Sequence, residues 1–389
     1  MRGKKILNFS IIAISFTVLM LAFVAVAPPV FADDCTTTVT APDSIQTAVD
    51  AASSGDVVCL DDSGGAFAQQ VVFDSSDSGI TLTAADDSSP VLDGSTLTGS
   101  TTISAIELLS GVTDVTIRGL EIKNYVGDSS GSDRSSGIVA ASGTTSDIKI
   151  EKNNIHDNFW NGILVFSAGD FEHDNWEVEK NDVTDNGFVG IELTNTGESS
   201  VSKNDVKDND IGIVIQARNT IAGSGLFTHP GDVSVIKNTV SGSFRNIYIL
   251  SLASGPLDPF PPIVGAQTSL SGVVVEKNEI SDCQECIWLL GFGGGTLSET
   301  EVVKNTIVTN SDAAAIGIRA PSFGSGLTEK SNIEKNDITA AGNWAIILAG
   351  ADDNEVLKNT LLATNPAPDR TGDDAVLDNG VNNQLIKND

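Results

Sequence analysis

Short runs of alternating apolar and polar residues recur along the chain from Val57 onward, and polar turns separate them. Typical runs are Ile148-Lys149-Ile150 and Gly190-Ile191-Glu192-Leu193. Apolar side chains at every second position are typical of a β-strand with one face against a core. One earlier stretch, Ser44 to Val49, is amphipathic, and Asp43 or Ser44 is a suitable N-cap for it. The pattern predicts an all-β protein with a short helix near its N-terminus.

One short phrase, Lys-Asn-x-(Ile/Val/Leu), recurs eight times, and a final Lys387-Asn388 follows near the end of the sequence. The closest copies, Asn181 to Asn204 and Asn336 to Asn359, are 23 residues apart. Because each copy has the same residues in the same order, stacking like on like requires parallel, in-register coils. Each coil should advance the stack by about 4.8 Å, the spacing of neighbouring strands. The repeat therefore predicts a solenoid of about a dozen coils.

The asparagines of this phrase are expected to form a ladder along one turn of the solenoid. Asn tolerates the left-handed backbone conformation that a sharp turn needs, and its amide can hydrogen-bond to the Asn above and below it. The Lys before each Asn should face solvent, and the apolar residue two positions after it should fill the core. The predicted ladder consists of Asn153, Asn181, Asn204, Asn238, Asn278, Asn305, Asn336 and Asn359.

The segments Gly55-Asp56-Val57-Val58, Val91-Leu92-Asp93-Gly94 and Val115-Thr116-Ile117 resemble the opening of the pectate lyase-like superfamily. The Asn-x-Ile and Gly-Ile-x-(Val/Leu) coils that follow are similar to the right-handed parallel β-helix repeat family, one branch of which is a periplasmic copper-binding accessory protein. The resemblance implies a single-stranded right-handed parallel β-helix over residues 61–389, after a cap helix and first strand in residues 33–60. The superfamily includes polysaccharide lyases, glycoside hydrolases, uronate epimerases and non-catalytic surface proteins, so the fold alone selects no activity.

The N-terminus is predicted to be a signal peptide covering residues 1–32. Basic residues Arg2, Lys4 and Lys5 precede an apolar run, and Val30-Phe31-Ala32 offers small residues for cleavage. The apolar run is long enough to span a bilayer, so an uncleaved anchor is the alternative. After cleavage no stable membrane span is expected. The protein is therefore expected to be secreted or held at the cell surface, or to reside in a periplasm-like space.

The four cysteines are expected to form disulfides, as suits an oxidising destination. A bridge between Cys35 and Cys59 would tie the cap helix to a first strand, Val57 to Leu60. Cys283 and Cys286 form a C-x-x-C pair, and no second pair or group of histidines completes a metal set. A local disulfide is the favoured interpretation of that pair.

The formal net charge of -30 disfavours nucleic acid and anionic membranes as partners. The acidity is equally explained as a solubility device. With 3 His, 4 Cys and 2 Met residues, the chain has few ligands for copper. No cofactor is firmly predicted; the metal is left unknown, with calcium as the one considered for a lyase. The sequence favours no oligomeric state.

Insertions concentrate after the Gly-Ile-type strand, in loops at roughly 166–176, 217–232, 251–271 and 320–331. Variable loops on a rigid scaffold often carry binding sites. The outward positions of this strand are unusually apolar, so the loops cover them, or a sugar or other ligand contacts them, or they form a protein interface. The binding candidates on this outward row are Phe166, Gln216, Tyr248, Trp288 and Arg319.

The best catalytic cluster in the sequence combines Glu192 with Arg218, Asp170 and His173, and each also has an interpretation as a solvated loop residue. Two functions remain open. One is a non-catalytic surface protein that binds extracellular polysaccharide or a cell-surface partner through this edge. The other is a polysaccharide lyase, hydrolase or epimerase acting at the same edge. The weak clustering of charges favours the first.

Overall fold

The computed structural model describes residues 34–97, 103–126, 135–141, 143–167, 173–219, 226–229, 231–253, 267–323, 325–365 and 369–389. Residues Asp34–Asp389 form one compact unit. The predicted signal peptide lies outside the described residues. Across the described ranges, no helix has the length and apolarity needed to cross a membrane.

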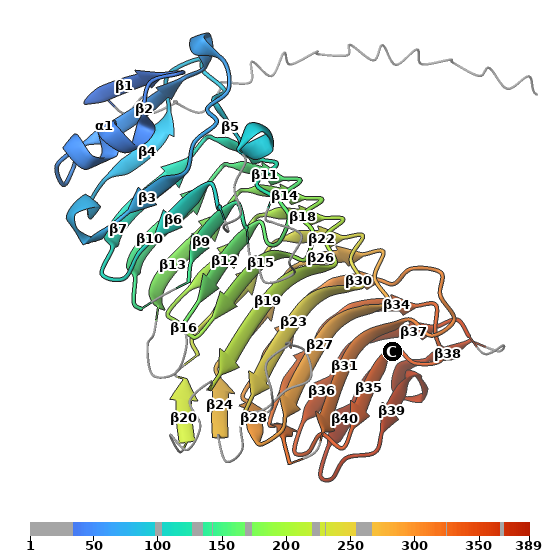
Figure 1. Ribbon diagram of the computed structural model, residues 1–389. Helices are drawn as coiled ribbons and strands as arrows, with labels where there is room; N and C mark the ends of the chain where they lie inside the picture. The colour runs from blue at the N-terminus through green and yellow to red at the C-terminus, as the bar shows by residue number, and fades with distance from the viewer. Residues whose placement is uncertain are drawn as a thin grey trace, which may run out of the picture. The chain divides into compact units, whose positions relative to one another are not determined.

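Three long parallel sheets line the stacked coils of this unit, and most coils contribute one short strand to each sheet (Figure 1). Sheet A is the first of them. Its 14 described strands are β1 (Thr37–Thr40), β2 (Val57–Asp61), β4 (Thr81–Ala84), β7 (Thr113–Arg118), β10 (Ser146–Glu151), β13 (His173–Glu179), β16 (Thr196–Gly197), β17 (Ser200–Ser202), β21 (Ser234–Ile236), β25 (Val274–Glu276), β29 (Glu301–Val303), β33 (Asn332–Glu334), β36 (Glu355–Leu357) and β40 (Gln384–Ile386).

Sheets B and C each contain 11 described strands. Sheet B consists of β5 (Val91–Asp93), β8 (Glu121–Lys123), β11 (Asn154–His156), β14 (Asp182–Thr184), β18 (Asp205–Lys207), β22 (Thr239–Ser241), β26 (Glu279–Ser281), β30 (Thr306–Val308), β34 (Asp337–Ala340), β37 (Thr360–Ala363) and β38 (Arg370–Thr371). Sheet C consists of β3 (Val71–Phe73), β6 (Ile106–Leu108), β9 (Ile138–Ala140), β12 (Ile163–Phe166), β15 (Val189–Thr194), β19 (Ile211–Arg218), β23 (Arg245–Leu252), β27 (Glu285–Phe292), β31 (Ile316–Phe323), β35 (Ile346–Ala349) and β39 (Val376–Asp378).

A fourth, smaller sheet D lies beyond the ends of the central strands of sheet C (Figure 1), and the sequence did not predict it. Its strands are β20 (Leu226–His229), β24 (Gln267–Ser271), β28 (Gly295–Ser298) and β32 (Leu327–Glu329). β20, β24 and β32 fall within segments expected to be loops, and β28 lies outside them. Sheet D therefore widens the middle coils at the edge where the insertions concentrate.

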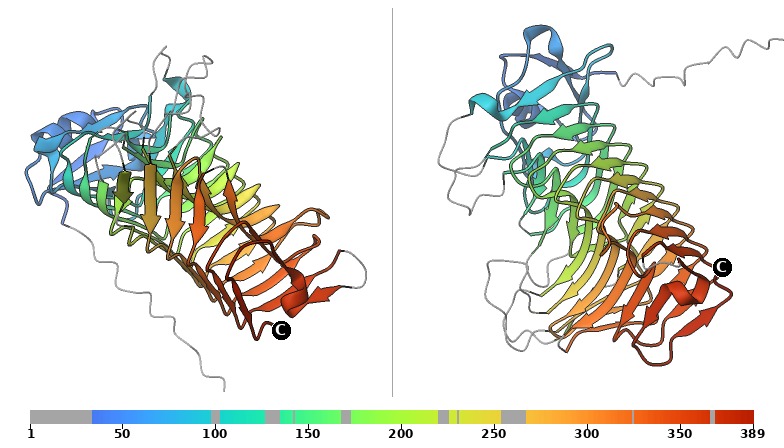
Figure 2. Two further views of the ribbon diagram at one scale, coloured as in Figure 1. Left: turned by 90° about the horizontal axis from the view of Figure 1, so that it is seen from below. Right: turned by 90° about the vertical axis from the view of Figure 1, so that its right-hand side faces the viewer.

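Neighbouring coils pair in parallel and in register, as predicted from the repeat. For example, Ile163 pairs with Ile191, which pairs in turn with Ile213. The exception is β38, which runs antiparallel to β37. Figure 2 shows the same stacking from two further sides. The prediction of a right-handed parallel β-helix of about a dozen coils is confirmed.

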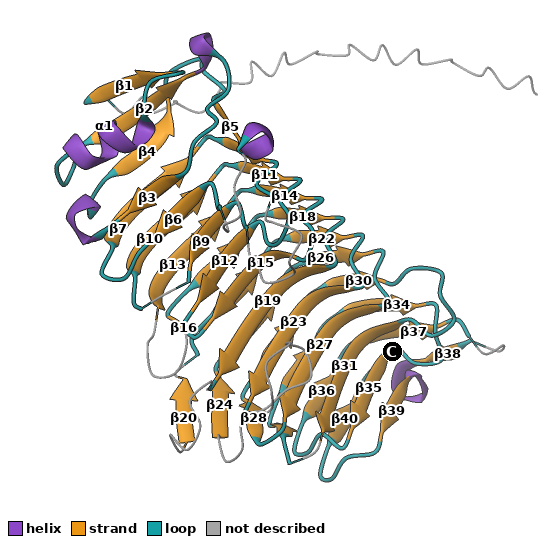
Figure 3. Ribbon diagram, viewed as in Figure 1, coloured by secondary structure: helices purple, strands orange, loops and turns teal. Residues whose placement is uncertain are grey.

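Helices occur near both ends of the described unit (Figure 3). The cap helix α1 (Ile45–Ala51) follows its N-cap residue, Ser44. The Ser44 hydroxyl accepts a hydrogen bond from the Thr47 N–H, as expected of an N-cap. The other helices are the short 3-10 turns η1 (Asp62–Gly64), η2 (Ser75–Asp77), η3 (Gly94–Thr96) and η4 (Gly372–Ala375).

The Cys35–Cys59 disulfide is present as predicted. The prediction that Val57 to Leu60 is the first strand was wrong, because β1 precedes the helix. Val39 of β1 pairs with Leu60 of β2. The disulfide therefore joins the segment before β1 to the strand with which β1 pairs.

The predicted asparagine ladder is confirmed, and its side chains are at most 2% exposed. In a typical rung, the Asn238 Oδ1 atom accepts hydrogen bonds from the backbone and side-chain N–H groups of Asn204. The Asn238 Nδ2 atom donates to the Asn278 Oδ1 atom and to the Val201 carbonyl. Each amide thus satisfies buried donors and acceptors of two neighbouring coils.

The expectation that Asn takes the left-handed conformation at this turn was wrong. The preceding Lys takes it, with φ between 53° and 59° in all nine copies. Because the Asn side chain must point inward to the ladder, the exposed Lys before it takes the left-handed conformation that the sharp turn requires. The lysines concerned are Lys152, Lys180, Lys203, Lys237, Lys277, Lys304, Lys335, Lys358 and Lys387.

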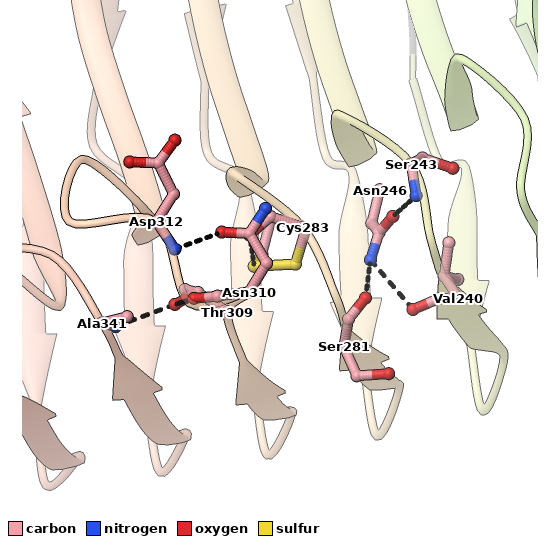
Figure 4. The surroundings of a disulfide bond; sticks show 10 residues. Val240, Ser243, Asn246, Ser281, Cys283, Thr309, Asn310, Asp312 and Ala341 are labelled. Atoms are coloured by element: carbon pink, nitrogen blue, oxygen red, sulfur yellow. Dashed lines mark hydrogen bonds between the residues drawn. A yellow bond between two sulfur atoms is a disulfide. The ribbon is translucent and has the colours of Figure 1, made fainter.

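A second, shorter ladder lies at the turn between sheets B and C, where Asn158, Asn186 and Asn209 bond in sequence. In a later coil, Asn246 closes this turn by accepting from the Ser243 N–H and donating to the Val240 and Ser281 carbonyls (Figure 4). One coil further on, the equivalent positions are Cys283 and Cys286, and they form the predicted local disulfide. The covalent bond therefore replaces a hydrogen-bonded turn.

The core is a stack of thin aliphatic layers inside the coils. The residue two positions after each ladder Asn points inward, as predicted, and is at most 2% exposed. Each such side chain stabilises the fold by about 1.5–3 kcal/mol on burial. These residues are Ile155, Val183, Val206, Val240, Ile280, Ile307, Ile338 and Leu361.

Candidate functional site

The outer face of sheet C carries a second apolar cluster, separate from the core inside the coils. Its fully buried members include Val214, Tyr248 and Leu290, and Trp288 is only 8% exposed. The apolar outward row predicted from the sequence is therefore buried rather than open to solvent. The proline-rich segment 256–262, one candidate cover, lies outside the described residues.

The predicted residues Tyr248, Trp288 and Arg319 occupy successive rungs of this face, because Tyr248 pairs with Trp288 and Trp288 with Arg319. The Tyr248 and Trp288 rings stack with their centroids 4.7 Å apart and their planes 2° from parallel. The guanidinium carbon of Arg319 lies 5.4 Å from the Trp288 ring centroid. Three neighbouring strands thus bring two aromatic rings and a cation into one column.

Two further residues, Arg245 and Glu285, complete this group. The Arg245 guanidinium carbon lies 4.0 Å from the Trp288 ring centroid. The Arg245 Nε atom donates to a Glu285 carboxylate oxygen at 2.8 Å, and the Arg319 Nη1 atom donates to the other oxygen. We call these five residues the Arg–Trp cluster: Arg245, Tyr248, Glu285, Trp288 and Arg319.

Glu285 holds both guanidinium groups in place. Its side chain is 8% exposed, against 19% for Arg245 and 30% for Arg319. Two arginines and one glutamate give the cluster a net charge of +1 within a chain of net charge -30. The cluster is therefore a local positive site on an acidic protein.

Three buried polar atoms of the cluster have no hydrogen-bond partner: the Tyr248 hydroxyl, the Trp288 Nε1 atom and the Arg319 Nε atom. Burial raises the pKa of Tyr248, so its hydroxyl keeps its proton. Leaving a buried polar group unpaired costs about 1–3 kcal/mol. The three atoms lie on successive rungs of this face, and each is covered from solvent.

The faces of the Trp288 ring are occupied by Tyr248 and by guanidinium groups. A sugar ring therefore has no open face of Trp288 on which to stack, contrary to one of the possibilities raised by the sequence. What the cluster offers a ligand is hydrogen-bond donors and positive charge rather than a bare aromatic platform.

Close backbone packing joins sheet C to sheet D beside the cluster. A Cβ atom on Gly291 would lie 1.9 Å from the Leu327 carbonyl oxygen, and one on Gly295 would lie 2.0 Å from the Ser251 carbonyl oxygen. Only glycine fits these two positions. The run Gly293-Gly294-Gly295 was the one sequence signal for this approach.

The two other predicted binding residues lie nearer the N-terminal coils. Gln216 is 8% exposed and pairs with Leu250 in the next strand. Phe166 is half-buried, and the Arg218 guanidinium carbon lies 6.0 Å from its ring centroid. Both are on the outer face of sheet C, outside the Arg–Trp cluster.

Three of the four predicted catalytic residues lie among the described residues. Glu192 accepts hydrogen bonds from the Asn161 side chain at 2.8 Å and the Thr194 hydroxyl at 3.0 Å. Arg218 lies four residues beyond Val214, the strand partner of Glu192, which corresponds to roughly 13 Å along the sheet. Asp170 lies outside the described residues.

His173 is a buried residue at the start of β13 rather than an exposed loop residue. It is 0% exposed, and its Nδ1 atom lies 2.8 Å from the Thr145 hydroxyl. Burial lowers the pKa of His173 to about 4, against an interaction with the Phe166 backbone that raises it. The imidazole is therefore neutral at pH 7 and belongs to the interior of its coil.

The described acidic residues on the strands of sheet C are widely separated. Glu107, Glu192, Glu285 and Asp378 are each three strands apart along the sheet, which corresponds to roughly 14 Å between successive ones. Glycosidase carboxylates lie about 5–9.5 Å apart. The described carboxylates of this face therefore form no hydrolase pair.

Metal-ligand groups are also sparse. Across the described ranges, no three His, Cys, Asp or Glu side chains lie close enough together to hold a metal ion. All four cysteines are in disulfides. The copper-binding branch of the family therefore has no support from these residues.

Comparison with known proteins supports the right-handed β-helix fold. Residues 47–211 match the family described as "Right handed beta helix region". With the stacked parallel sheets, this match confirms the resemblance to right-handed parallel β-helix proteins that the sequence showed. No curated protein sequence matches the chain.

Among solved structures, the chain is similar to two modules of mannuronan C-5 epimerases from Azotobacter vinelandii. For the AlgE6 A-module, the TM-score is 0.57 at 14% identity over 88% of this chain and 91% of that one. For the AlgE4 A-module, it is 0.54 at 16% identity over 88% and 92%. The Dettilon tailspike protein gives 0.53 at 18% identity over 84% of this chain and 62% of its own. At these identities the likeness shows a shared fold.

Proposed function

We propose that the protein binds an extracellular polysaccharide through the Arg–Trp cluster and does not catalyse its cleavage. The observation that carries this proposal is the pair of partly exposed guanidinium groups of Arg245 and Arg319, which the nearly buried Glu285 holds in place. Sugars carry many oxygen atoms that accept hydrogen bonds, and polar groups placed at fixed positions orient such ligands.

The solenoid is suited to a repeating ligand because its rungs repeat at about 4.8 Å. A polymer that lies across the partly exposed side chains of Arg245 and Arg319 meets β23 and β31, which are two rungs apart. The two disulfides and the predicted signal peptide support an extracellular or cell-surface location. The fold shared with the mannuronan epimerase modules is compatible with a polysaccharide ligand.

The absence of catalysis is supported by the described residues of sheet C. Glu285 is neutralised by two arginines, and Glu192 is engaged by Asn161 and Thr194. Among the described residues on the strands of sheet C, neither carboxylate has a second one at the separation that glycoside hydrolysis needs. A binding role requires only the donors that the cluster already presents.

The test is affinity electrophoresis of the mature chain against neutral and acidic polysaccharides, with and without calcium, together with an assay for new unsaturated or reducing ends. We expect retention by at least one polymer and no new ends. Retention by none would overturn the binding role. New ends that disappear in Arg218→Ala would establish catalysis instead.

Matched variants separate binding from folding. Tyr248→Phe removes only the unpaired hydroxyl, so the free energy of unfolding should stay equal or rise by up to about 1 kcal/mol. Arg319→Gln removes a partly exposed guanidinium group, and affinity should fall about tenfold, since one hydrogen bond to ligand is worth about 1.4 kcal/mol. The matched control is Arg370→Gln, because the Arg370 guanidinium carbon lies 3.9 Å from the Trp344 ring centroid, outside the cluster. An equal loss of affinity in that control would contradict the location.

A further inference from the structure

We infer that the turn between sheets B and C docks a cationic amphipathic helix of a partner protein. The docking surface is a strip of exposed aromatic side chains bordered by a row of aspartates, and we call it the aromatic–aspartate strip. It follows successive coils between β11 and β26, and Figure 4 shows the same turn at Ser243 and Cys283. These side chains are distinct from the Arg–Trp cluster, so the inference goes beyond the proposed function.

Four aromatic residues give the strip its apolar surface. Phe159 is 39% exposed and Phe244 is 49% exposed. The Phe188 N–H donates to the Trp160 carbonyl at 2.8 Å, so these two residues lie in adjacent coils, and their ring centroids are 4.6 Å apart. Phe188 also packs against the apolar cluster on the outer face of sheet C. The strip is therefore a partly exposed continuation of that buried cluster.

A row of aspartates borders the aromatic side chains. Asp185, Asp208 and Asp282 each directly follow a strand of sheet B, and each is exposed with φ between 53° and 55°. Asp157 holds the same position in an earlier coil, where the His156 Nδ1 atom lies 2.7 Å from its carboxylate. Among the described residues, no ion pair compensates the other three carboxylates. The row therefore presents uncompensated negative charge.

The geometry of the turn does not require these carboxylates. Asp, Asn and Gly all tolerate the left-handed conformation, and Gly242 holds the position in the coil between Asp208 and Asp282. Asp210 lies among the aromatic residues, because the Phe244 N–H donates to its carbonyl, and its φ is outside the left-handed region. Asp210 is exposed as well. Neutral residues would build the same turn, so the charge is available for binding.

The spacing of the coils suits a helix better than an extended peptide. Rungs repeat at about 4.8 Å and the turns of an α-helix at about 5.4 Å, so successive helical turns meet successive coils. Side chains on one face of an extended strand repeat at about 6.6–6.8 Å, which falls out of step after one rung. The three rungs from Asp185 to Asp282 span about 14 Å, the length of about 10 helical residues.

Other classes of ligand fit the strip less well. The aspartate row repels acidic glycans and anionic lipid surfaces. A neutral sugar stacks on an open ring face, but the Arg245 guanidinium carbon lies 4.8 Å from the Phe244 ring centroid, and the Trp160 and Phe188 rings pack together. A cationic helix uses both parts of the strip. Its apolar side chains cover the aromatic residues, and flanking Lys or Arg side chains reach the aspartates.

The test is fluorescence anisotropy with three labelled helical peptides of about 14 residues, each long enough to cover the row. The first has a Leu face bordered by Lys, the second has Glu in place of Lys, and the third has Gln in place of Leu. At 0.15 M salt we expect the first peptide to bind at least about tenfold more tightly than the other two. Its affinity should fall at higher salt, because exposed charge pairs are screened.

Matched charge variants locate the contact. Asp185→Asn/Asp208→Asn keeps residues that tolerate the turn and removes two charges, so affinity for the first peptide should fall about three- to tenfold. The control is Asp114→Asn/Asp353→Asn, which makes the same change at two exposed aspartates with φ of 56° outside the strip. The control should leave the affinity unchanged.

Matched apolar variants complete the set. Phe159→Ser/Phe244→Ser should lower the affinity about tenfold or more, since both rings lose their contact with the helix. The control is Val381→Ser, because Val381 is 61% exposed and lies outside the strip. Arg319→Gln should not change the affinity for the peptide. Thermal melts of each variant check that the fold is intact.

The opposite results overturn the inference. Equal binding of the Lys and Glu peptides would show that charge does not select the partner. Displacement of the first peptide by the neutral sugar cellohexaose would assign the strip to a glycan. An unchanged affinity in both strip variants, or an equal loss in their controls, would show that the peptide binds elsewhere.

Discussion

Removing one amide from the middle of the asparagine ladder should destabilise the protein strongly. Asn238→Ala deletes four hydrogen bonds: two accepted from Asn204, one donated to the Val201 carbonyl and one donated to Asn278. Their donor–acceptor distances are 2.9–3.0 Å, and Asn238 is 1% exposed. At about 1 kcal/mol each, with buried partners left unpaired, the free energy of unfolding should fall by about 3–5 kcal/mol.

The assay is equilibrium denaturation in guanidinium chloride, followed by circular dichroism. Asn343→Ala is the control, because Asn343 lies on an exposed turn, and it should change the free energy of unfolding by less than about 0.5 kcal/mol. A loss below about 1 kcal/mol in Asn238→Ala would refute the argument that the ladder stabilises the stacked coils.

A double substitution sharpens this test. Asn204 and Asn238 share two hydrogen bonds, so each single variant already loses them. The Asn204→Ala/Asn238→Ala variant should therefore cost about 2 kcal/mol less than the sum of the two single variants. Strict additivity would show that the two amides act independently, which the ladder geometry excludes.

Three further outcomes are expected. Burial lowers the pKa of His173 from 6.5 to about 4, so neutral His173 stabilises the fold fully above pH 6.5. This stabilisation, about 3 kcal/mol, is lost as the pH falls toward 4. The free energy of unfolding of His173→Gln should lack this part of the pH dependence, and parallel curves for the two proteins would contradict the burial argument. Lys237→Val should lower the free energy of unfolding by about 1–2 kcal/mol although Lys237 is exposed, because its φ of 59° disfavours β-branched residues. Lys237→Asn should be tolerated. Equal denaturation midpoints for the two variants would argue against backbone strain. Cys35→Ser/Cys59→Ser should destabilise the N-terminal coil by up to about 3.5 kcal/mol, the value for a closed loop of this length, and unchanged proteolysis of that coil would show that the disulfide is dispensable.

The fold was predictable because its signals are local and repeated. Each copy of the Lys-Asn phrase places one residue on the ladder, one in solvent and one in the core, and the copies reinforce one another. The cap helix and both disulfides were also recognisable, because Ser44 caps its own helix and each cysteine pair lies within one turn or between neighbouring rungs. The left-handed conformation was assigned to the Asn of the phrase instead of the Lys before it. The sequence does not show which of the two residues can adopt it while the Asn side chain points inward to the ladder.

The candidate site was only partly predictable. Alternation counted back from Ile247 places Arg245 inward, yet its guanidinium lies against outward-facing Trp288. The side chain of Asn246, between these two positions, is buried and bonds to the Val240 and Ser281 carbonyls, so simple alternation fails at this point. Sheet D was missed because its strands come from irregular insertions, with Leu226 pairing to Gln267 across 41 residues of chain.

The structure of the protein with an oligosaccharide of four to six sugars tests the central claim most directly. We predict that the oligosaccharide contacts the partly exposed guanidinium groups of Arg245 on β23 and Arg319 on β31. The contradicting result is an oligosaccharide bound elsewhere, for example in the polar groove on sheet A lined by Glu276, Lys304, Glu334 and Lys335, with the Arg–Trp cluster unchanged.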